Sequence, residues 1–255
     1  MKIGLVLSGG GARGIAHIGV IKALEELGVK PDVISGTSAG SIVGVLYASG
    51  MKPAEIFEVV SHLSIFKSVK IAWAWSGLLK MEGLQALLTK HIPDNTFESL
   101  KIPLTVAATE IRLGEIRYFS SGELAPAIIS SCSIPGVFDP VHFNDRLYVD
   151  GGLLDNLPAR PIRDKCDFLV GSNCNHLTTS YDEHSLKAVI ERSMLITINA
   201  NTTASRMLCD LVIEPPYMAR YSVFEMGKAQ EIYDAAYKYT KENFFAHHFQ
   251  KTRVA

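Results

Sequence analysis

The sequence has little of what marks several common classes of protein. Its 25 lysine and arginine residues nearly balance 26 aspartate and glutamate residues, which leaves a formal net charge of −1. The excess of positive charge that steers proteins toward nucleic acid is therefore missing. With 47% hydrophobic residues, the low hydrophobicity of disordered chains is missing as well. These absences exclude nucleic-acid binding as the main activity and predict a folded, globular protein.

Metal-binding and disulfide patterns are also absent. There are four cysteines, namely Cys132, Cys166, Cys174 and Cys209. They form no Cys-x-x-Cys pair, and no histidine stands at zinc-finger spacing from them, so we expect no metal site. Widely scattered cysteines in a chain of this length predict reduced thiols, as in a cytoplasmic protein.

Long apolar runs are missing too. The first run, Ile3–Leu7, is too short for a secretory signal. No later run approaches the roughly 20 residues of a transmembrane helix. We therefore expect a cytoplasmic location and leave peripheral contact with the inner face of a membrane open.

Short strands and helices alternate along the chain, which predicts an α/β fold. The first fifty residues follow the order strand, glycine-rich turn, helix, strand, turn, helix, an order typical of parallel strands with right-handed crossovers. Further strands are expected at 104–109, 115–119, 146–149, 167–172 and 211–214. Helices are expected over much of 53–102 and at 123–132, 182–200 and 223–244. Because no linker or repeat interrupts this order, we expect one domain over 1–255, with 223–255 as a C-terminal helix and tail.

Three glycine-marked turns follow predicted strands, at residues 9–14, 36–40 and 150–152. In open α/β sheets, functional sites form at the carboxyl ends of the strands. The three turns are therefore expected to share one crevice.

The first turn contains a Gly-x-Gly-x-x-Gly string through Gly9, Gly11 and Gly14, a pattern known from dinucleotide-binding proteins. Such a site needs an acidic residue at the end of the second strand. Here that strand ends before Gly36, and Asp32 lies at its start. What remains is a set of backbone N–H groups at a helix N-terminus, where negative charge is stabilised. In an acyl-transfer enzyme that charge is a tetrahedral oxyanion.

The second turn is a Gly-x-Ser-x-Gly at a strand-to-helix junction. Gly36 and Gly40 allow a sharp elbow that presents Ser38 as a nucleophile. The alternative is that Ser38 simply caps the following helix. The strand before and the helix after favour the elbow, although the α/β-hydrolase order of strands does not fit an elbow on the second strand.

A proton acceptor for Ser38 is the next requirement. None of the eight histidines follows a predicted strand in a catalytic pattern, and His17 is expected to pack or cap. Asp150 follows a strand and precedes Gly151 and Gly152, which let the chain turn toward another loop. Its carboxylate, with an ordinary pKa of about 3.9, is a useful base only in dry surroundings. The alternative is an ordinary Asp-Gly turn.

Taken together and in this order, the three motifs resemble those of the patatin-like phospholipase family, above all its short bacterial members. The likeness runs from residue 2 to about 161 and includes Ser-Cys-Ser-Ile-Pro-Gly at 131–136 and Asp-Asn-Leu-Pro at 155–158. One departure is Ser8, where many members carry aspartate, and we expect it to affect loop packing only.

The resemblance implies a three-layer sandwich with a mainly parallel central sheet flanked by helices. It also implies a lipid acyl hydrolase that works through a serine–aspartate dyad without a metal ion, and we expect no cofactor. Ser38 matches the nucleophile and Asp150 the proton acceptor. The backbone amides of Gly9, Gly10 and Gly11 match the oxyanion hole. Arg13 lies beside them in the motif.

The expected reaction is hydrolysis of lipid carboxylic esters, of phospholipase A or lysophospholipase type, through an acyl-enzyme. The expected partner is a lipid or ester substrate. A soluble esterase, thioesterase or acyltransferase on the same dyad is the alternative, as is a catalytically idle lipid-binding regulator.

Two segments bear on membrane contact. Residues 66–80 contain Phe66, Trp73 and Trp75 among lysines that end at Lys80, a composition that suits an interfacial segment or a lid, or a helix packed on the core. The tail at 244–253 combines aromatic and basic residues, and a frayed helix end is the alternative to lipid contact.

Overall fold

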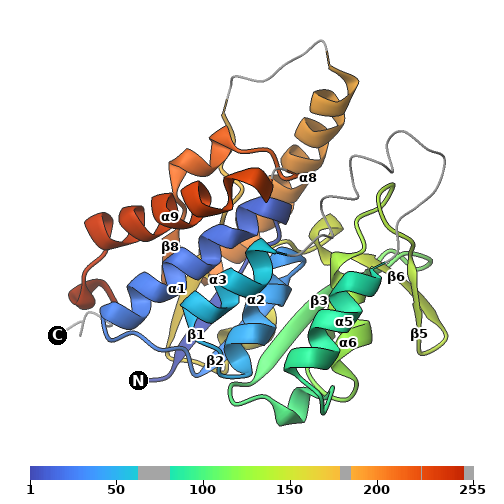
Figure 1. Ribbon diagram of the computed structural model, residues 1–255, viewed down its shortest axis with the longest axis horizontal. Helices are drawn as coiled ribbons and strands as arrows, with labels where there is room; N and C mark the ends of the chain where they lie inside the picture. The colour runs from blue at the N-terminus through green and yellow to red at the C-terminus, as the bar shows by residue number, and fades with distance from the viewer. Residues whose placement is uncertain (63–80, 179–184, 225, 250–255) are drawn as a thin grey trace.

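The computed structural model describes residues 1–62, 81–178, 185–224 and 226–249 (Figure 1). The segment at 66–80, with both tryptophans, lies outside the described residues. Within them, no helix has the length and apolar character needed to cross a membrane.

A mixed sheet forms the centre of the molecule, with helices on its faces (Figure 1). Its strands are β1 (Ile3–Leu7), β2 (Val33–Thr37), β3 (Leu104–Glu110), β4 (Glu115–Phe119), β5 (Val141–Phe143), β6 (Arg146–Asp150), β7 (Phe168–Ser172) and β8 (Leu211–Ile213). The pairings run β5-β6-β3-β2-β1-β7-β8, and β4 also pairs with β3. The strands from β3 to β8 along this series are parallel, whereas β4, β5 and β6 pair antiparallel. The predicted α/β class with a mainly parallel sheet is confirmed.

The helices are α1 (Ala16–Glu26), α2 (Ala39–Ala48), α3 (Pro53–Ser61), α5 (Glu82–His91), α6 (Leu124–Cys132), α7 (Arg160–Arg163), α8 (Leu186–Leu208) and α9 (Ala229–Asn243). Alternate residues of β1 enter different cores: Leu5 and Leu7 join the large core under α1, α2 and α9, and Val6 joins a smaller one that includes Ile162 of α7. Because successive strand residues point to opposite faces, both faces of the sheet are covered.

Helix boundaries in the second half differ from the prediction. Helix α8 continues to Leu208, and α9 begins only at Ala229, after 3-10 turns at Pro216–Arg220 and Met226–Lys228. The tail is also packed through its last described residue. Phe249 is buried and its ring lies 6.3 Å from that of Phe168, so the described part of the tail is not frayed.

Strand β5 was not predicted, and it sets the direction of β6. The two strands form a hairpin whose two-residue turn, Asn144 and Asp145, has φ values of 47° and 59°. Two left-handed residues make the turn type that fits the twist of a tight hairpin. Asn-Asp between two short apolar runs is the sequence signal that points to it.

The registers around β3 bring two strand ends together. Strand β4 pairs with Val106 to Glu110, while β2 pairs with Leu104 to Ala107 and β6 with Ala108 to Glu110. A strand has two edges, so β2 and β6 lie one after the other on the edge of β3 opposite β4. Since β2 runs parallel to β3 and β6 antiparallel, their carboxyl ends meet beside Ala107 and Ala108.

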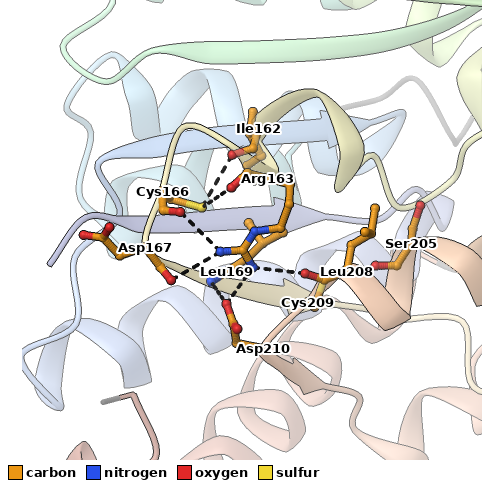
Figure 2. Close-up of polar contacts among 9 residues, drawn as sticks. All are labelled: Ile162, Arg163, Cys166, Asp167, Leu169, Ser205, Leu208, Cys209 and Asp210. Carbon is orange, nitrogen blue, oxygen red and sulfur yellow. Dashed lines mark hydrogen bonds and ion pairs between the residues drawn. The ribbon is translucent and has the colours of Figure 1, made fainter. Parts of the chain in front are cut away.

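A cluster of polar contacts fixes one end of α8 to the sheet (Figure 2). Arg163 pairs with Asp210 at 2.6 Å and donates to the carbonyl oxygens of Leu208 and Cys166. Asp210 also accepts the N–H of Leu169 in β7 at 2.7 Å. These contacts anchor the C-terminal end of α8, whose earlier turns extend away from it (Figure 1).

Candidate active site

Ser38 stands at a sharp elbow between β2 and α2. Its φ of 53° and ψ of −125° are unusual for a residue with a side chain. The glycines of the motif permit the close approach: a Cβ at Gly36 would lie 2.7 Å from the Gly40 carbonyl oxygen, and one at Gly40 would overlap the carbonyl oxygen of Leu7. The Ser38 N–H donates to Ser131 Oγ at 2.8 Å. The Ser38 side chain makes no capping hydrogen bond to α2, which removes the capping interpretation.

Asp150 meets Ser38 from the end of β6. Its carboxylate accepts the N–H of Gly152 at 2.7 Å and faces the Ser38 side chain, whose hydroxyl lowers the pKa of the carboxyl group. Burial raises the pKa of Asp150 from 3.8 to about 6, because an anion is poorly solvated there, and the Ser38 hydroxyl and the Gly152 N–H partly offset the rise. The Asp150 carboxylate therefore lies in the dry surroundings that a carboxylate base requires.

The close crossing of the Asp150 turn over β3 depends on Gly151. A Cβ on this residue would overlap the carbonyl oxygen of Ala107 and lie 3.1 Å from Cγ2 of Thr37. The three turns were predicted to share one crevice at the carboxyl ends of their strands. The turns do converge, but Asp150 arrives from the opposite direction, on the antiparallel β6.

Within the described ranges, the glycine loop has two free backbone donors, whereas three were predicted. The Gly9 N–H is already donated to the carbonyl oxygen of Asn156 at 3.1 Å. Among the described residues, no acceptor is hydrogen-bonded to the N–H groups of Gly10 and Gly11, and both residues border the cavity that contains Ser38 and Asp150. Gly14 packs directly against Ala39, which presses the loop onto the elbow.

Arg13 binds the backbone of segments that lie far from it in the sequence. It is buried, and it donates from Nε to the carbonyl oxygen of Tyr221 at 2.7 Å and from Nη1 to that of His176 at 3.5 Å. Burial lowers the pKa of Arg13. The position beside the loop was predicted, but the side chain ties the loop to distant segments and does not border the cavity.

His17 and Ser8 support the loop from beneath. His17 is buried and its Nε2 donates to the Ser8 carbonyl oxygen at 2.8 Å, so its unprotonated Nδ1 accepts from Ser172 Oγ at 2.8 Å. Burial lowers the pKa of His17 to about 4, which keeps the ring neutral. Ser8 Oγ accepts the N–H of Cys174 at 3.1 Å. Both residues pack the loop, and neither borders the cavity.

An apolar cavity of about 240 Å³ opens beside Ser38 and Asp150. Apolar residues that border it include Ile134, Leu153, Met194, Leu195, Ile198 and Phe224. Three of these come from α8, in the part of the chain where no motif was recognised. Only helical periodicity marks α8 in the sequence, and periodicity does not say which site a helix borders.

A short strap at 221–224 joins α8 to the glycine loop. The Val223 N–H donates to the Glu191 carboxylate of α8 at 2.9 Å, and the Val223 carbonyl oxygen accepts the N–H of Ala12 at 2.8 Å.

Across the described ranges, no three His, Cys, Asp or Glu side chains are grouped so that they could hold a metal ion.

The motifs that meet at this site are also those of a known family. The model of the patatin-like phospholipase family matches residues 5–163, which include the glycine loop, the elbow and the Asp150 turn. The chain belongs to this family.

The proteins similar to this chain in sequence are longer than the chain itself. An uncharacterized NTE family protein of Mycobacterium bovis is 37% identical over 163 residues, which cover 63% of this chain and 45% of the relative. Lysophospholipase NTE1 of Kluyveromyces lactis is 29% identical over 282 residues, covering 98% of this chain and 19% of the relative. The chain thus spans less than half the length of these relatives.

Two solved structures show weaker likeness to this patatin-like chain. VipD from Legionella pneumophila has a TM-score of 0.49 and 18% identity, covering 92% of this chain and 67% of that one. The type III effector protein ExoU has a TM-score of 0.46 and 17% identity, covering all of this chain and 54% of that one. At these scores the structural likeness adds nothing to the family assignment.

Proposed function

We propose that the protein is a serine acyl hydrolase that cleaves carboxylic esters of lipids, with Ser38 as the nucleophile and Asp150 as the proton acceptor. The observation that carries the proposal is that the Ser38 side chain faces the buried Asp150 carboxylate at the border of an apolar cavity. A hydroxyl needs a neighbouring base to become a nucleophile, and Asp150 is a base with a raised pKa of about 6.

In this mechanism Ser38 Oγ attacks the ester carbonyl carbon while Asp150 takes the hydroxyl proton. The N–H groups of Gly10 and Gly11 stabilise the oxyanion, since each is free of another acceptor in the described part of the chain. Protonated Asp150 then gives its proton to the departing alcohol and leaves the acyl group on Ser38. Water repeats the sequence, releases the fatty acid and restores the serine hydroxyl.

The cavity favours a substrate with one acyl chain in the site. Its volume of about 240 Å³ lies below the roughly 300–1,000 Å³ of pockets that hold drug-sized ligands. Its largely apolar border suits a hydrocarbon chain, and Ser38 and Asp150 lie on this border, where they can reach the ester group. The name lysophospholipase carried by fungal relatives supports the same class of substrate. Phospholipase A or lysophospholipase activity is therefore the proposed reaction.

Active-site labelling and a substrate panel test this function. A fluorophosphonate probe is expected to form an adduct located on Ser38 by peptide mass spectrometry. Lysophospholipid micelles and phospholipid vesicles are expected to be hydrolysed faster than short soluble esters or thioesters at equal ester concentration. Absence of an adduct would favour a lipid-binding regulator. A hydrolysis rate that does not increase above the critical micelle concentration would favour a soluble esterase.

The rate of hydrolysis should depend on the protonation of Asp150. Because only the carboxylate accepts a proton, kcat/KM for a neutral ester is expected to rise with pH and to be half-maximal near pH 6. Initial rates between pH 4.5 and 8.5 measure this, with melting curves at each pH to exclude unfolding. A profile that stays flat across pH 5 to 7 would argue against Asp150 as the base.

A further inference from the structure

Asn156 holds a buried amide oxygen for which the described part of the chain provides no donor. The residue is 1% exposed, and its main chain is fully used: the N–H donates to Asn201 Oδ1 at 3.0 Å and the carbonyl accepts from Gly9. Its Nδ2 donates to the Gly9 carbonyl oxygen at 3.5 Å. Among the described residues, nothing is hydrogen-bonded to Asn156 Oδ1. Leaving a buried polar atom unpaired is costly, so such an atom points to a ligand where it also borders a cavity, as Asn156 does.

The unpaired oxygen lies between the two loops that carry the proposed chemistry. A Cβ at Gly152 would be 2.9 Å from Asn156 Oδ1 and 3.0 Å from Asp150 Oδ1. A Cβ at Gly9 would contact the same oxygen and would lie 3.1 Å from Ser38 Cβ. Asn156 borders the cavity together with Ser38 and Asp150. Its amide orientation follows from Gly9, because the reverse orientation would set Oδ1 against the Gly9 carbonyl oxygen.

We infer that Asn156 Oδ1 binds and orients the water molecule that hydrolyses the acyl-enzyme, a role that rests on the proposed function. A water that gives one proton to a base still has a second O–H group, which needs an acceptor inside an apolar cavity. A neutral amide oxygen supplies it without competing for the transferred proton. Asp150 and Asn156 thus hold the two O–H groups and leave a lone pair for the attack.

Hydrolysis of the acyl-enzyme consumes one water molecule and restores both Ser38 and Asp150. The water oxygen forms a bond to the acyl carbon, and one water proton moves to the Asp150 carboxylate. The bond between the acyl carbon and Ser38 Oγ breaks, and Oγ takes the proton back from Asp150. The second O–H, held by Asn156 during the attack, leaves with the fatty acid. Acylation of Ser38 uses no water, so Asn156 is expected to act on deacylation alone.

Pre-steady-state kinetics separate the two half-reactions. With a p-nitrophenyl ester, the first release of p-nitrophenol measures acylation and the later steady rate measures deacylation. Asn156→Leu has nearly the same shape and removes the oxygen. Its first phase is expected to stay within about threefold of the wild type, while its steady rate falls about tenfold, the effect of one lost hydrogen bond. Acylated Ser38 should then accumulate and be visible by intact mass. Asn156→Ala is the second variant and is expected to show the same division.

Asn175→Ala is the matched control. Asn175 is also buried, also has an unpaired Oδ1 among the described residues, and donates from Nδ2 to the Gly9 carbonyl oxygen at 2.6 Å. It does not border the cavity. Loss of this bond disturbs the glycine loop, so both kinetic phases are expected to fall together.

Different failures of this experiment have different meanings. If Asn156→Leu and Asn156→Ala slow both phases equally, as in the control, Asn156 only supports the loop and the inference is wrong. If they slow only glycerol esters that carry a free hydroxyl, the oxygen binds substrate instead of water, which also overturns it. If the wild type forms no acyl-enzyme with any ester, the proposed function itself fails.

Discussion

Asp150→Asn is expected to lower kcat for ester hydrolysis about 10³-fold while making the folded protein more stable. The loss of activity follows because an amide cannot accept the Ser38 proton, and general-base catalysis contributes roughly 10²- to 10⁴-fold. The gain in stability follows from burial of the carboxylate, whose folded pKa of about 6 lies above its ordinary value of 3.8.

The sign of the stability effect depends on pH. Between pH 4 and 6 the folded state binds more protons at Asp150 than the unfolded state does, so the free energy of unfolding falls as pH rises through this range. A rise in pKa from 3.8 to about 6 means that the ionised carboxylate lowers the free energy of unfolding by about 3 kcal/mol at pH 8. Asp150→Asn has no buried charge at this position, so its free energy of unfolding is not lowered in this way. Its melting temperature should exceed that of the wild type by on the order of 5 °C at pH 8, and the difference should shrink toward pH 4.

Thermal melts at pH 4, 6 and 8 and steady-state rates at pH 8 measure both effects. Because asparagine before glycine deamidates readily, intact mass must show that the amide persists, and Asp150→Ala serves as a control for activity. Retained hydrolysis in the intact amide variant would remove Asp150 from the mechanism. A lower melting temperature at pH 8 would show that the hydrogen bonds of the carboxylate outweigh its burial.

Ser38→Ala and Ser38→Gly are both expected to abolish hydrolysis and fluorophosphonate labelling, with rates lowered by more than about 10⁴-fold. The two variants should differ in stability. Ser38 has a φ of 53°, where a Cβ causes strain and glycine does not. The free energy of unfolding of Ser38→Gly is therefore expected to be about 1 kcal/mol higher than that of Ser38→Ala.

Urea unfolding of both variants measures this difference, and the comparison cancels the loss of the hydroxyl, which they share. Equal stabilities would show that the elbow stores no backbone strain. Measurable turnover in either variant, after exclusion of a contaminating esterase by a second purification, would remove Ser38 as the nucleophile.

Local pattern was enough to predict the elements around the site. The strand Ile3–Leu7, the elbow and the Asp-Gly-Gly turn each follow from residues next to one another, because glycine spacing and a short apolar run define them locally. The antiparallel direction of β6 was not predicted. It depends on β5 and the turn at Asn144 and Asp145, which are too short to give a clear periodic signal.

The detailed roles inside the loop also needed the fold. The Gly9 N–H looked equivalent to its neighbours in the sequence, yet it is committed to Asn156, which lies 147 residues away along the chain. Arg13 was placed near the oxyanion donors, but its side chain turns to Tyr221 and His176. Contacts between segments so distant in sequence leave no local pattern.

The sequence by itself determined the family, the α/β class and the three motifs, because each depends on residue types at fixed short spacing. Only the tertiary structure decided what these motifs share. It set Ser38 and Asp150 together at two strand ends on one edge of β3, raised the pKa of Asp150 by burial, and closed the cavity with α8. The physical reason is that desolvation and cavity shape arise from every segment that surrounds a point in space. A motif carries only the few residues that happen to be adjacent in the chain.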